Sequence, residues 1–462
     1  MDYINRKIEE NINEIISVLQ NFIKIDTQQD TPELNAPFGR GNKKALDYLI
    51  SLAEKYGLKY YNMDNYLCWI EIGEGQEMLA FPVHLDVVPP GEGWSVNPFG
   101  AVQKDGYIYG RGAVDNKGPA VLMLFVLKFL QQNPKILLKK RVRVIFGTNE
   151  ETGMECIKYY KAKGGEEPTM GFTPDAMYPV VIGEKGMIHI NVRKKLEIDV
   201  KKPFIKLNGG EKSNVVPEKT QCLIYNLQNS EKAEIEKLRK IKDERFIFED
   251  KNNEVYLKYN GQACHASNPE KGINSIAYMN EILSEINIDF NGKNEIKKFN
   301  DVIGKGYFGE KAQLNIEDKI FGKLTLNLGI LKIQKDEIYG EIDIRYPKNI
   351  TEKEILDRLQ EKFGREYEIK KENGKPLHYV DKNTELVKRL MKVFVEETGR
   401  KEEYLVIGGG TYASQFKNIV GFGPKFKEIR TGGHGRDERI SIQSLKDNLR
   451  IYYKAVLALL EN

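Results

Sequence analysis

The sequence predicts an α/β fold in which a mixed, mostly parallel sheet with flanking helices is combined with an inserted α+β domain. First, helical periodicity alternates with short, almost wholly apolar runs that are typical of buried strands. Second, this strand–helix–strand order implies that the sheet is at least partly parallel. Third, the pattern changes near Lys185, because β-type alternation follows from Met187 and helical patterning returns only near residues 274–286.

The N-terminal part begins with a helix, because apolar residues between Ile8 and Ile23 recur at spacings of three and four. Residues 28–41 are polar and contain two prolines, which predicts a loop. A second helix is expected over about residues 43–56. A strand is expected over residues 67–72.

The next strand covers residues 78–83, is almost wholly apolar and ends at His84. Residues 91–112 are rich in loop-forming residues and predict a loop. Residues 118–132 predict a helix that is apolar nearly all round and is therefore buried. A further apolar strand is expected over residues 143–146.

The C-terminal part returns to helices. Thr384 is expected to cap a helix over residues 385–398, and Gly399 is expected to end it. A last helix is expected over residues 441–460. The predicted domains are therefore one discontinuous α/β domain, built from residues 1–186 and 379–462, and one inserted domain of residues 187–378.

The composition is that of an ordinary globular protein and excludes several partners. Lys plus Arg is 71 and Asp plus Glu is 67, and this net charge of +4 is too small to indicate nucleic acid or an anionic membrane as a partner. The four cysteines are too few for a disulfide framework in so long a chain. The longest apolar run, residues 119–130, is too short to span a bilayer, and no signal peptide is evident at the start. The expected location is the cytoplasm.

Candidate ligands for a metal ion lie at the ends of the predicted strands. His84 and Asp86 are two residues apart, so in an extended chain they point to the same side. A histidine and a carboxylate at the end of an α/β strand suit a divalent metal, because one can bind it and the other can orient the ligand. As an isolated pair, a histidine and an aspartate at this spacing are more often structural than metal-binding.

A glycine-rich loop, Gly110–Gly118, precedes the buried helix. Loops of this kind often bind phosphate, but Asp115 occupies the position of the third glycine of a dinucleotide-binding motif. A carboxylate at this position repels a pyrophosphate and attracts a cation. The loop therefore favours a metal ion over a nucleotide.

Two adjacent carboxylates, Glu150 and Glu151, directly follow the predicted strand of residues 143–146. Neighbouring carboxylates repel each other unless a positive charge lies beside them. A metal explains both, if one binds it and the other acts as general base on a metal-bound water. Asp175 and His434 follow loop-forming residues and are further candidate ligands, and either could also be a solvated loop residue.

In order, these residues resemble the di-zinc metallopeptidase family that includes aminoacylase, the glutamate carboxypeptidases and peptidase V. The pattern is His-x-Asp, Gly-Arg-Gly-x-x-Asp-x-Lys-Gly, Glu-Glu-x-Gly, an Asp and a late His, and it extends from Pro82 to His434. The local sequence is most similar to that of the peptidase V dipeptidases, in the segments His84–Pro89, Trp94–Phe99, Ser213–Pro217 and Gly409–Ala413.

The resemblance implies a role for each matching residue of the metal centre. Asp115 would bridge two divalent metal ions, and the peptide bond after it would be cis. His84 and Asp175 would complete one metal site, and Glu151 and His434 would complete the other. Glu150 would be the general base and acid, and Asp86 would orient His84. These ligands suit Zn²⁺ first, with Mn²⁺ or Co²⁺ as alternatives.

The resemblance also implies that the inserted domain is a lid over a catalytic domain. His265 of this lid would polarise the scissile carbonyl, and Asn214 and Arg345 would contact the substrate. The lid is long, as in the peptidase V type, which favours a monomeric dipeptidase of broad specificity acting on small peptides. The alternatives are an N-acyl amino acid deacylase of the same family and a non-catalytic metal-binding relative.

Overall fold

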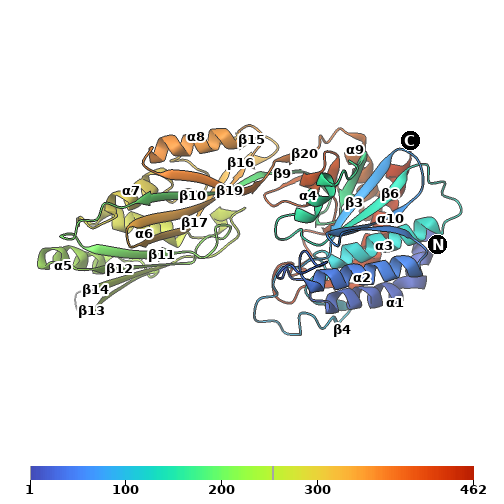
Figure 1. Ribbon diagram of the computed structural model, residues 1–462, viewed down its shortest axis with the longest axis horizontal. Helices are drawn as coiled ribbons and strands as arrows, with labels where there is room; N and C mark the ends of the chain where they lie inside the picture. The colour runs from blue at the N-terminus through green and yellow to red at the C-terminus, as the bar shows by residue number, and fades with distance from the viewer. Residues whose placement is uncertain (1, 252–253, 462) are drawn as a thin grey trace. The chain divides into compact units, whose positions relative to one another are not determined.

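The computed structural model describes residues 2–251 and 254–461 and divides the chain into two compact units (Figure 1). The first unit comprises the chain up to Gly183, His378–Val406 and the chain from Gly410 onward. The second comprises Glu184–Leu377 and Ile407–Gly409. The predicted fold class, a mixed sheet with helices together with an inserted α+β region, is confirmed.

The first unit is built on a nine-stranded mixed sheet. Its strand order is β1 (Lys59–Met63), β2 (Leu67–Ile72), β6 (Arg141–Gly147), β3 (Met78–His84), β7 (Met170–Thr173), β22 (Ile419–Gly421), β9 (Val180–Glu184) and β20 (His378–Tyr379), and β21 (Tyr404–Ile407) also pairs with β9. The pairings of β6 with β3, β3 with β7 and β7 with β22 are parallel. Those of β1 with β2 and β2 with β6 are antiparallel. The parallel centre is where buried apolar strands were predicted.

The helices of the first unit pack around this sheet and against one another. They are α1 (Tyr3–Lys24), α2 (Arg40–Lys55), α3 (Lys117–Gln131), α4 (Glu155–Ala162), α9 (Glu385–Thr398) and α10 (Ile442–Leu460). Helix α3 is buried along nearly its whole length, as its all-round apolar sequence predicts. Helix α10 packs against α1, α3 and α9.

Three predictions for the first unit require correction. The predicted loop of residues 91–112 contains β4 (Val102–Lys104) and β5 (Tyr107–Tyr109), and β5 pairs with β24 (Arg439–Ser441). The helix α2 begins earlier than predicted, inside the predicted loop of residues 28–41. Helix α9 has the predicted bounds and Thr384 is its N-cap residue, but the Thr384 hydroxyl donates to the backbone oxygen of Asp381 and makes no capping hydrogen bond to the helix. Strands of three residues are too short to show periodicity, so the first error could not be avoided.

The second unit is an antiparallel sheet with helices. The strand order is β13 (Phe246–Lys251), β14 (Glu254–Asn260), β12 (Lys219–Tyr225), β11 (Phe204–Gly209), β17 (Thr325–Gln334), β18 (Glu337–Tyr346), β10 (Gly186–Lys195) and β19 (Glu368–Lys375). The helices are α5 (Asn229–Ile235), α6 (Ser275–Glu285), α7 (Lys293–Val302) and α8 (Glu352–Phe363). Helix α6 packs on β12, β14 and β17, and α7 contacts both α6 and α8 (Figure 1). The prediction that helical structure returns only near residue 274 is wrong, because α5 precedes it; this helix is too short to show a clear period.

The remaining elements are small. Strands β8 (Ala176–Met177) and β23 (Pro424–Lys425) pair in the first unit, and β15 (Glu317–Asp318) and β16 (Gly322–Lys323) pair in the second. Single turns of 3₁₀ helix cover Glu236–Lys240, Pro269–Lys271 and Tyr412–Gln415. Among the described residues, no helix combines the length and the apolar character that crossing a bilayer requires.

Candidate metal centre

Three of the segments that carry predicted ligands meet at one edge of the first unit's sheet. His84 is the last residue of β3 and lies opposite Gly147, the last residue of β6. Glu150 and Glu151 follow β6 within four residues, and Asp175 follows β7 within two. Because β6, β3 and β7 are adjacent and parallel, their carboxyl ends lie at the same edge, where sites form in α/β sheets.

Asp115 reaches this edge from the loop before α3. The Asp115–Asn116 peptide bond is cis, as the resemblance implies. The carboxylate of Glu438 holds the loop by accepting hydrogen bonds from the N–H groups of Gly112 (3.1 Å), Val114 (2.9 Å) and Asp115 (3.0 Å). Glu438 is itself buried and paired with Arg111 at 2.7 Å. The carboxylate of Glu438, which comes from a distant segment, therefore fixes the backbone conformation of the loop that carries Asp115.

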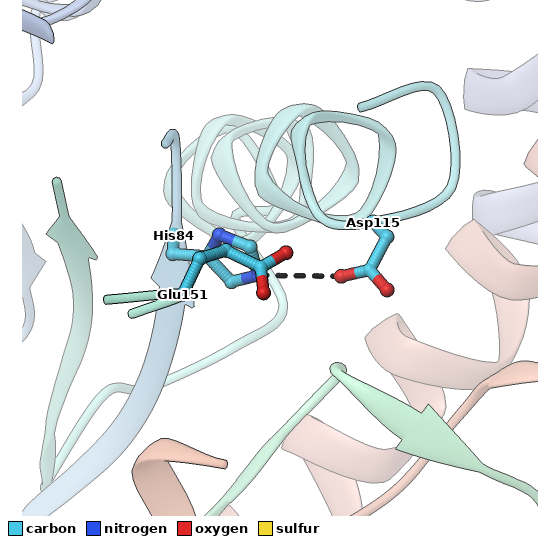
Figure 2. Close-up of side chains that lie close together, drawn as sticks. All are labelled: His84, Asp115 and Glu151. Atoms are coloured by element: carbon cyan, nitrogen blue, oxygen red, sulfur yellow. Dashed lines mark ion pairs between the residues drawn. The ribbon is translucent and has the colours of Figure 1, made fainter. Parts of the chain in front are cut away.

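His84 presents one ring nitrogen to two carboxylates. Its Nδ1 lies 3.0 Å from the backbone oxygen of Asp86, which can only accept, so Nδ1 carries the proton. Its Nε2 lies 3.3 Å from Oδ1 of Asp115, as the dashed line in Figure 2 marks, and 3.6 Å from Oδ2 of Asp175. This buried Nε2 has no hydrogen-bond partner among the described residues. An imidazole nitrogen aimed between two carboxylates fits a metal ion; burial lowers the pKa of His84, but the carboxylates of Asp175, Asp115 and Asp86 outweigh it and hold the pKa well above its usual value.

The other oxygen of Asp115 faces a second set of donors. Its Oδ2 lies 3.4 Å from Nε2 of His434, and that nitrogen lies 2.9 Å from Oε1 of Glu151. Ligand atoms of His84, Asp115 and Glu151 all lie within 4.8 Å of one another, as do those of His84, Glu150 and Asp175. The structure thus brings together the six predicted residues Glu150, His84, Asp115, Glu151, Asp175 and His434.

The electrostatics are those of carboxylates crowded together in a buried site. Burial, and then the charge of Asp115, raises the pKa of Asp175 to about 6. Burial by itself would raise the pKa of Asp115. The ammonium group of Lys425 and the imidazoles of His84 and His434 outweigh burial and hold this pKa well below its usual range. The hydrogen bond to Glu151 raises the pKa of His434 to about 9. Divalent cations would relieve the repulsion between these carboxylates.

Asp86 contacts more than His84. Its Oδ1 accepts a hydrogen bond from the N–H of Glu150 and its Oδ2 accepts one from the N–H of Glu151, both at 3.0 Å. Its carboxylate lies 3.5 Å from Nδ1 of His84, so the shorter contact with the ring comes from its backbone oxygen. The buried carboxylate of Asp86 therefore positions the two glutamates as well as the histidine.

Two contacts of the site have no counterpart in the sequence interpretation. The ammonium group of Lys425 lies 2.8 Å from Oδ2 of Asp115. The amide of Asn116 donates to the backbone oxygen of Pro174 at 2.7 Å and to Oδ1 of Asp175 at 3.3 Å, which links the Asp115 and Asp175 segments. Asn116 is part of the recognised motif and could have been included. Lys425 belongs to no recognised motif, and its position nine residues before His434 does not indicate that it lies in the site.

The other predicted residues, His265, Asn214 and Arg345, belong to the second unit. His265 is exposed, its Nδ1 lies 2.8 Å from the hydroxyl of Ser267, and Ala266 beside it donates to the backbone oxygen of Asn214 at 3.0 Å. Asn214 and His265 therefore lie on neighbouring segments.

Arg345 is buried and already engaged. Its Nε and Nη2 donate to the carboxylate of Asp343 at 2.6 and 2.7 Å, and its Nη1 donates to the backbone oxygen of Gly408 at 2.9 Å. These bonds use three of the five N–H donors of a guanidinium group. The roles of these residues of the second unit toward a substrate stay predictions.

Comparisons with known proteins agree with one another. A family model described as peptidase family M20/M25/M40 matches residues 80–458. A Bacillus subtilis (strain 168) protein named "Putative dipeptidase YtjP" is 34% identical, over 96% of this chain and 97% of that protein. A Staphylococcus aureus (strain MRSA252) protein named "Putative dipeptidase SAR1836" is 31% identical, over 98% of both.

Among solved structures, human carnosine dipeptidase 1 is similar to this chain with a TM-score of 0.60. The likeness covers 99% of this chain and 98% of that chain at 13% identity. At such a low identity the likeness concerns the fold alone.

Proposed function

Because the chain belongs to peptidase family M20/M25/M40, as its resemblance to metallopeptidases indicates, we propose that it is a two-metal dipeptidase of broad specificity. The names of its relatives in Bacillus subtilis and Staphylococcus aureus favour a dipeptidase over a deacylase. The proposed metals are two divalent ions per chain, with Zn²⁺ first and Mn²⁺ or Co²⁺ as alternatives.

The observation that carries the proposal is the orientation of the Asp115 carboxylate. Its Oδ1 faces His84, which also faces Asp175, and its Oδ2 faces His434, which also contacts Glu151. Each oxygen thus belongs to a separate set of one histidine and one further carboxylate. A carboxylate placed between two such sets is suited to bridge two cations.

We assign the chemistry as follows. His84, Asp115, Asp175, Glu151 and His434 would hold two divalent ions, which would supply Lewis-acid polarisation of a substrate carbonyl and activation of a water. Glu150 takes a proton from the attacking water and delivers it to the leaving amine. Asp86 keeps Glu150 and His84 in place through the hydrogen bonds described above. The second unit acts as the lid of the catalytic first unit. Within this lid, His265 donates a hydrogen bond to the carbonyl oxygen of the substrate, and Asn214 and Arg345 hold the substrate.

The cytoplasm is the proposed place of action. Cys68, Cys156 and Cys222 are buried free thiols, and Cys264 is also unpaired. Free thiols are usual in a reducing compartment. Small peptides released there would be the substrates.

The test is a substrate panel with each metal supplied in turn. We expect hydrolysis of many dipeptides with a free amino end and little activity on N-acetylated amino acids or tetrapeptides. We expect this preference because a lid domain with Asn214 and Arg345 would enclose a short substrate at both ends. Faster hydrolysis of N-acetylated amino acids than of any dipeptide would favour the deacylase instead.

The same panel tests Arg345 through the substrate carboxylate. Arg345→Ala should lower kcat/KM for free dipeptides by about tenfold or more, the usual scale for a hydrogen bond to a charged group. Because the change also removes one of the two partners of the buried Asp343 and leaves it only His189, C-terminally amidated dipeptides serve as the control. If wild-type enzyme hydrolyses amidated and free dipeptides equally well, Arg345 has no such role.

The working unit is proposed to be a monomer in which His265 serves its own active site. The second unit spans Glu184–Leu377, which is a full domain's length. A domain of this length can form the whole lid, including His265, within one molecule. A shorter insertion would need a second subunit to supply this histidine.

Mixing two inactive variants, Glu150→Gln and His265→Ala, decides between the two arrangements. Under conditions that allow subunit exchange, the mixture should stay inactive, because each chain lacks one of its own groups. Light scattering should report a mass near 53.1 kDa, the mass of one chain. Recovery of activity on mixing would show that the histidine acts across subunits.

A further inference from the structure

Lys425 is fixed beside the metal centre by its backbone. It lies in β23, which pairs in parallel with β8, the strand that directly follows Asp175. The backbone oxygen of Lys425 accepts a hydrogen bond from the N–H of Tyr178 at 2.9 Å, and that of Gly423 accepts one from the N–H of Ala176. The segment that carries Lys425 is thus tied to the segment that carries a predicted ligand.

The side chain of Lys425 contacts one particular oxygen of the site. Its Nζ lies 2.8 Å from Oδ2 of Asp115, and the two side chains are 25% and 8% exposed. This is the oxygen that also faces His434 at 3.4 Å, whereas Oδ1 faces His84. The two halves of the centre are therefore unequal, because the ammonium group is hydrogen-bonded to the Asp115 oxygen of one half, whereas it acts on Asp175 of the other half through its charge alone.

Resting on the proposed two-metal function, we propose that Lys425 makes the two metal positions unequal in affinity. The weak position is that of Asp115 Oδ2, Glu151 and His434, and the tight one is that of Asp115 Oδ1, His84 and Asp175. The ammonium group repels a divalent cation beside Oδ2, and this repulsion is only partly screened, because the Asp115 side chain is 8% exposed while that of His434 is 55% exposed. Its N–H also occupies a lone pair of the oxygen that would bind the ion.

Lys425 therefore acts as a positioning and tuning residue, and one of the two ions is readily exchanged. The weakly held ion would follow the concentration of free metal, so the enzyme would be fully loaded only when that concentration is high. The opposite interpretation is that Lys425 merely holds Asp115 in place. In that case its removal would weaken the binding of both ions.

The experiment measures metal binding directly, by calorimetry and equilibrium dialysis of the full chain with Zn²⁺. Wild type should bind two ions in two separable steps. Lys425→Met should tighten the weaker step by about tenfold or more and leave the tighter step nearly unchanged, since the effect of a charge falls with distance. Lys425→Arg keeps the charge and should retain two separable steps.

Lys427→Met is the matched control, because this lysine lies two residues further along the same segment and is exposed. It should bind both ions as wild type does. Thermal unfolding of the metal-free proteins checks that each variant folds.

The outcomes separate this inference from the proposed function. Two unequal ions in wild type and tighter binding in Lys425→Met support it. Unchanged or weaker binding in Lys425→Met overturns it while leaving the two-metal function intact. A wild-type chain that binds fewer than two ions overturns both.

Discussion

The Asp115→Ala variant is expected to lose both bound metal ions and, with them, all measurable peptidase activity. Asp115 faces both sets of donors, through Oδ1 toward His84 and through Oδ2 toward His434. Without it, the proposed ligands of each ion fall to one histidine and one carboxylate, and only at the His84 and Asp175 position does a further carboxylate, Glu150, lie close enough to replace it. The variant also removes the carboxylate that lies 2.8 Å from the ammonium group of Lys425, so the positive charge near His434 is less well offset.

Elemental analysis of the purified variant and hydrolysis of a dipeptide are the measurements. Asp115→Asn, which keeps the shape of the side chain and removes its charge, should also bind less metal. Asp47→Ala serves as the control, since Asp47 is exposed on α2 and pairs only with Lys43 at the surface. If Asp115→Ala keeps one ion at full affinity, Asp115 does not bridge.

The Glu150→Gln variant is expected to keep both metal ions while its activity drops by at least about a hundredfold, the usual scale for losing a general base. Glutamine has the same shape but cannot take up a proton. The backbone of residue 150 would stay in place, because its N–H bonds to Asp86 whatever the side chain.

The measurement is again metal content beside turnover. The structure makes this test necessary, since ligand atoms of Glu150, His84 and Asp175 lie close enough together to hold an ion. If Glu150→Gln loses metal, then Glu150 is a ligand and the roles of the two glutamates require exchange. Glu155→Gln is the matched control, because Glu155 is exposed at the start of α4 and pairs with Lys158.

Much of the first unit could be predicted because its signals are local. The run of residues 78–83 is apolar throughout, and it forms a buried strand that ends at His84. The segment around residues 118–132 is apolar on all sides and forms the buried helix α3. A polar residue that directly follows a buried strand can be placed at the edge of a sheet without knowledge of its neighbours.

Other features could not be predicted because their partners are distant in the sequence. Strand β5 is three residues long and pairs with β24, more than three hundred residues away. Arg345 donates a hydrogen bond to the backbone oxygen of Gly408, 63 residues further along the chain. Neither contact leaves a pattern in the local sequence.

By itself, the sequence determined the α/β class, the strand ends that carry His84 and Glu150, and the peptidase family. These follow from periodicity and from ordered motifs, which are properties of short segments. Only the tertiary structure decided that Asp115 turns its two oxygens to different partners and that Lys425 lies against one of them. The physical reason is that a carboxylate's direction depends on what surrounds it, and here those groups come from loops up to 319 residues apart (His434 − Asp115).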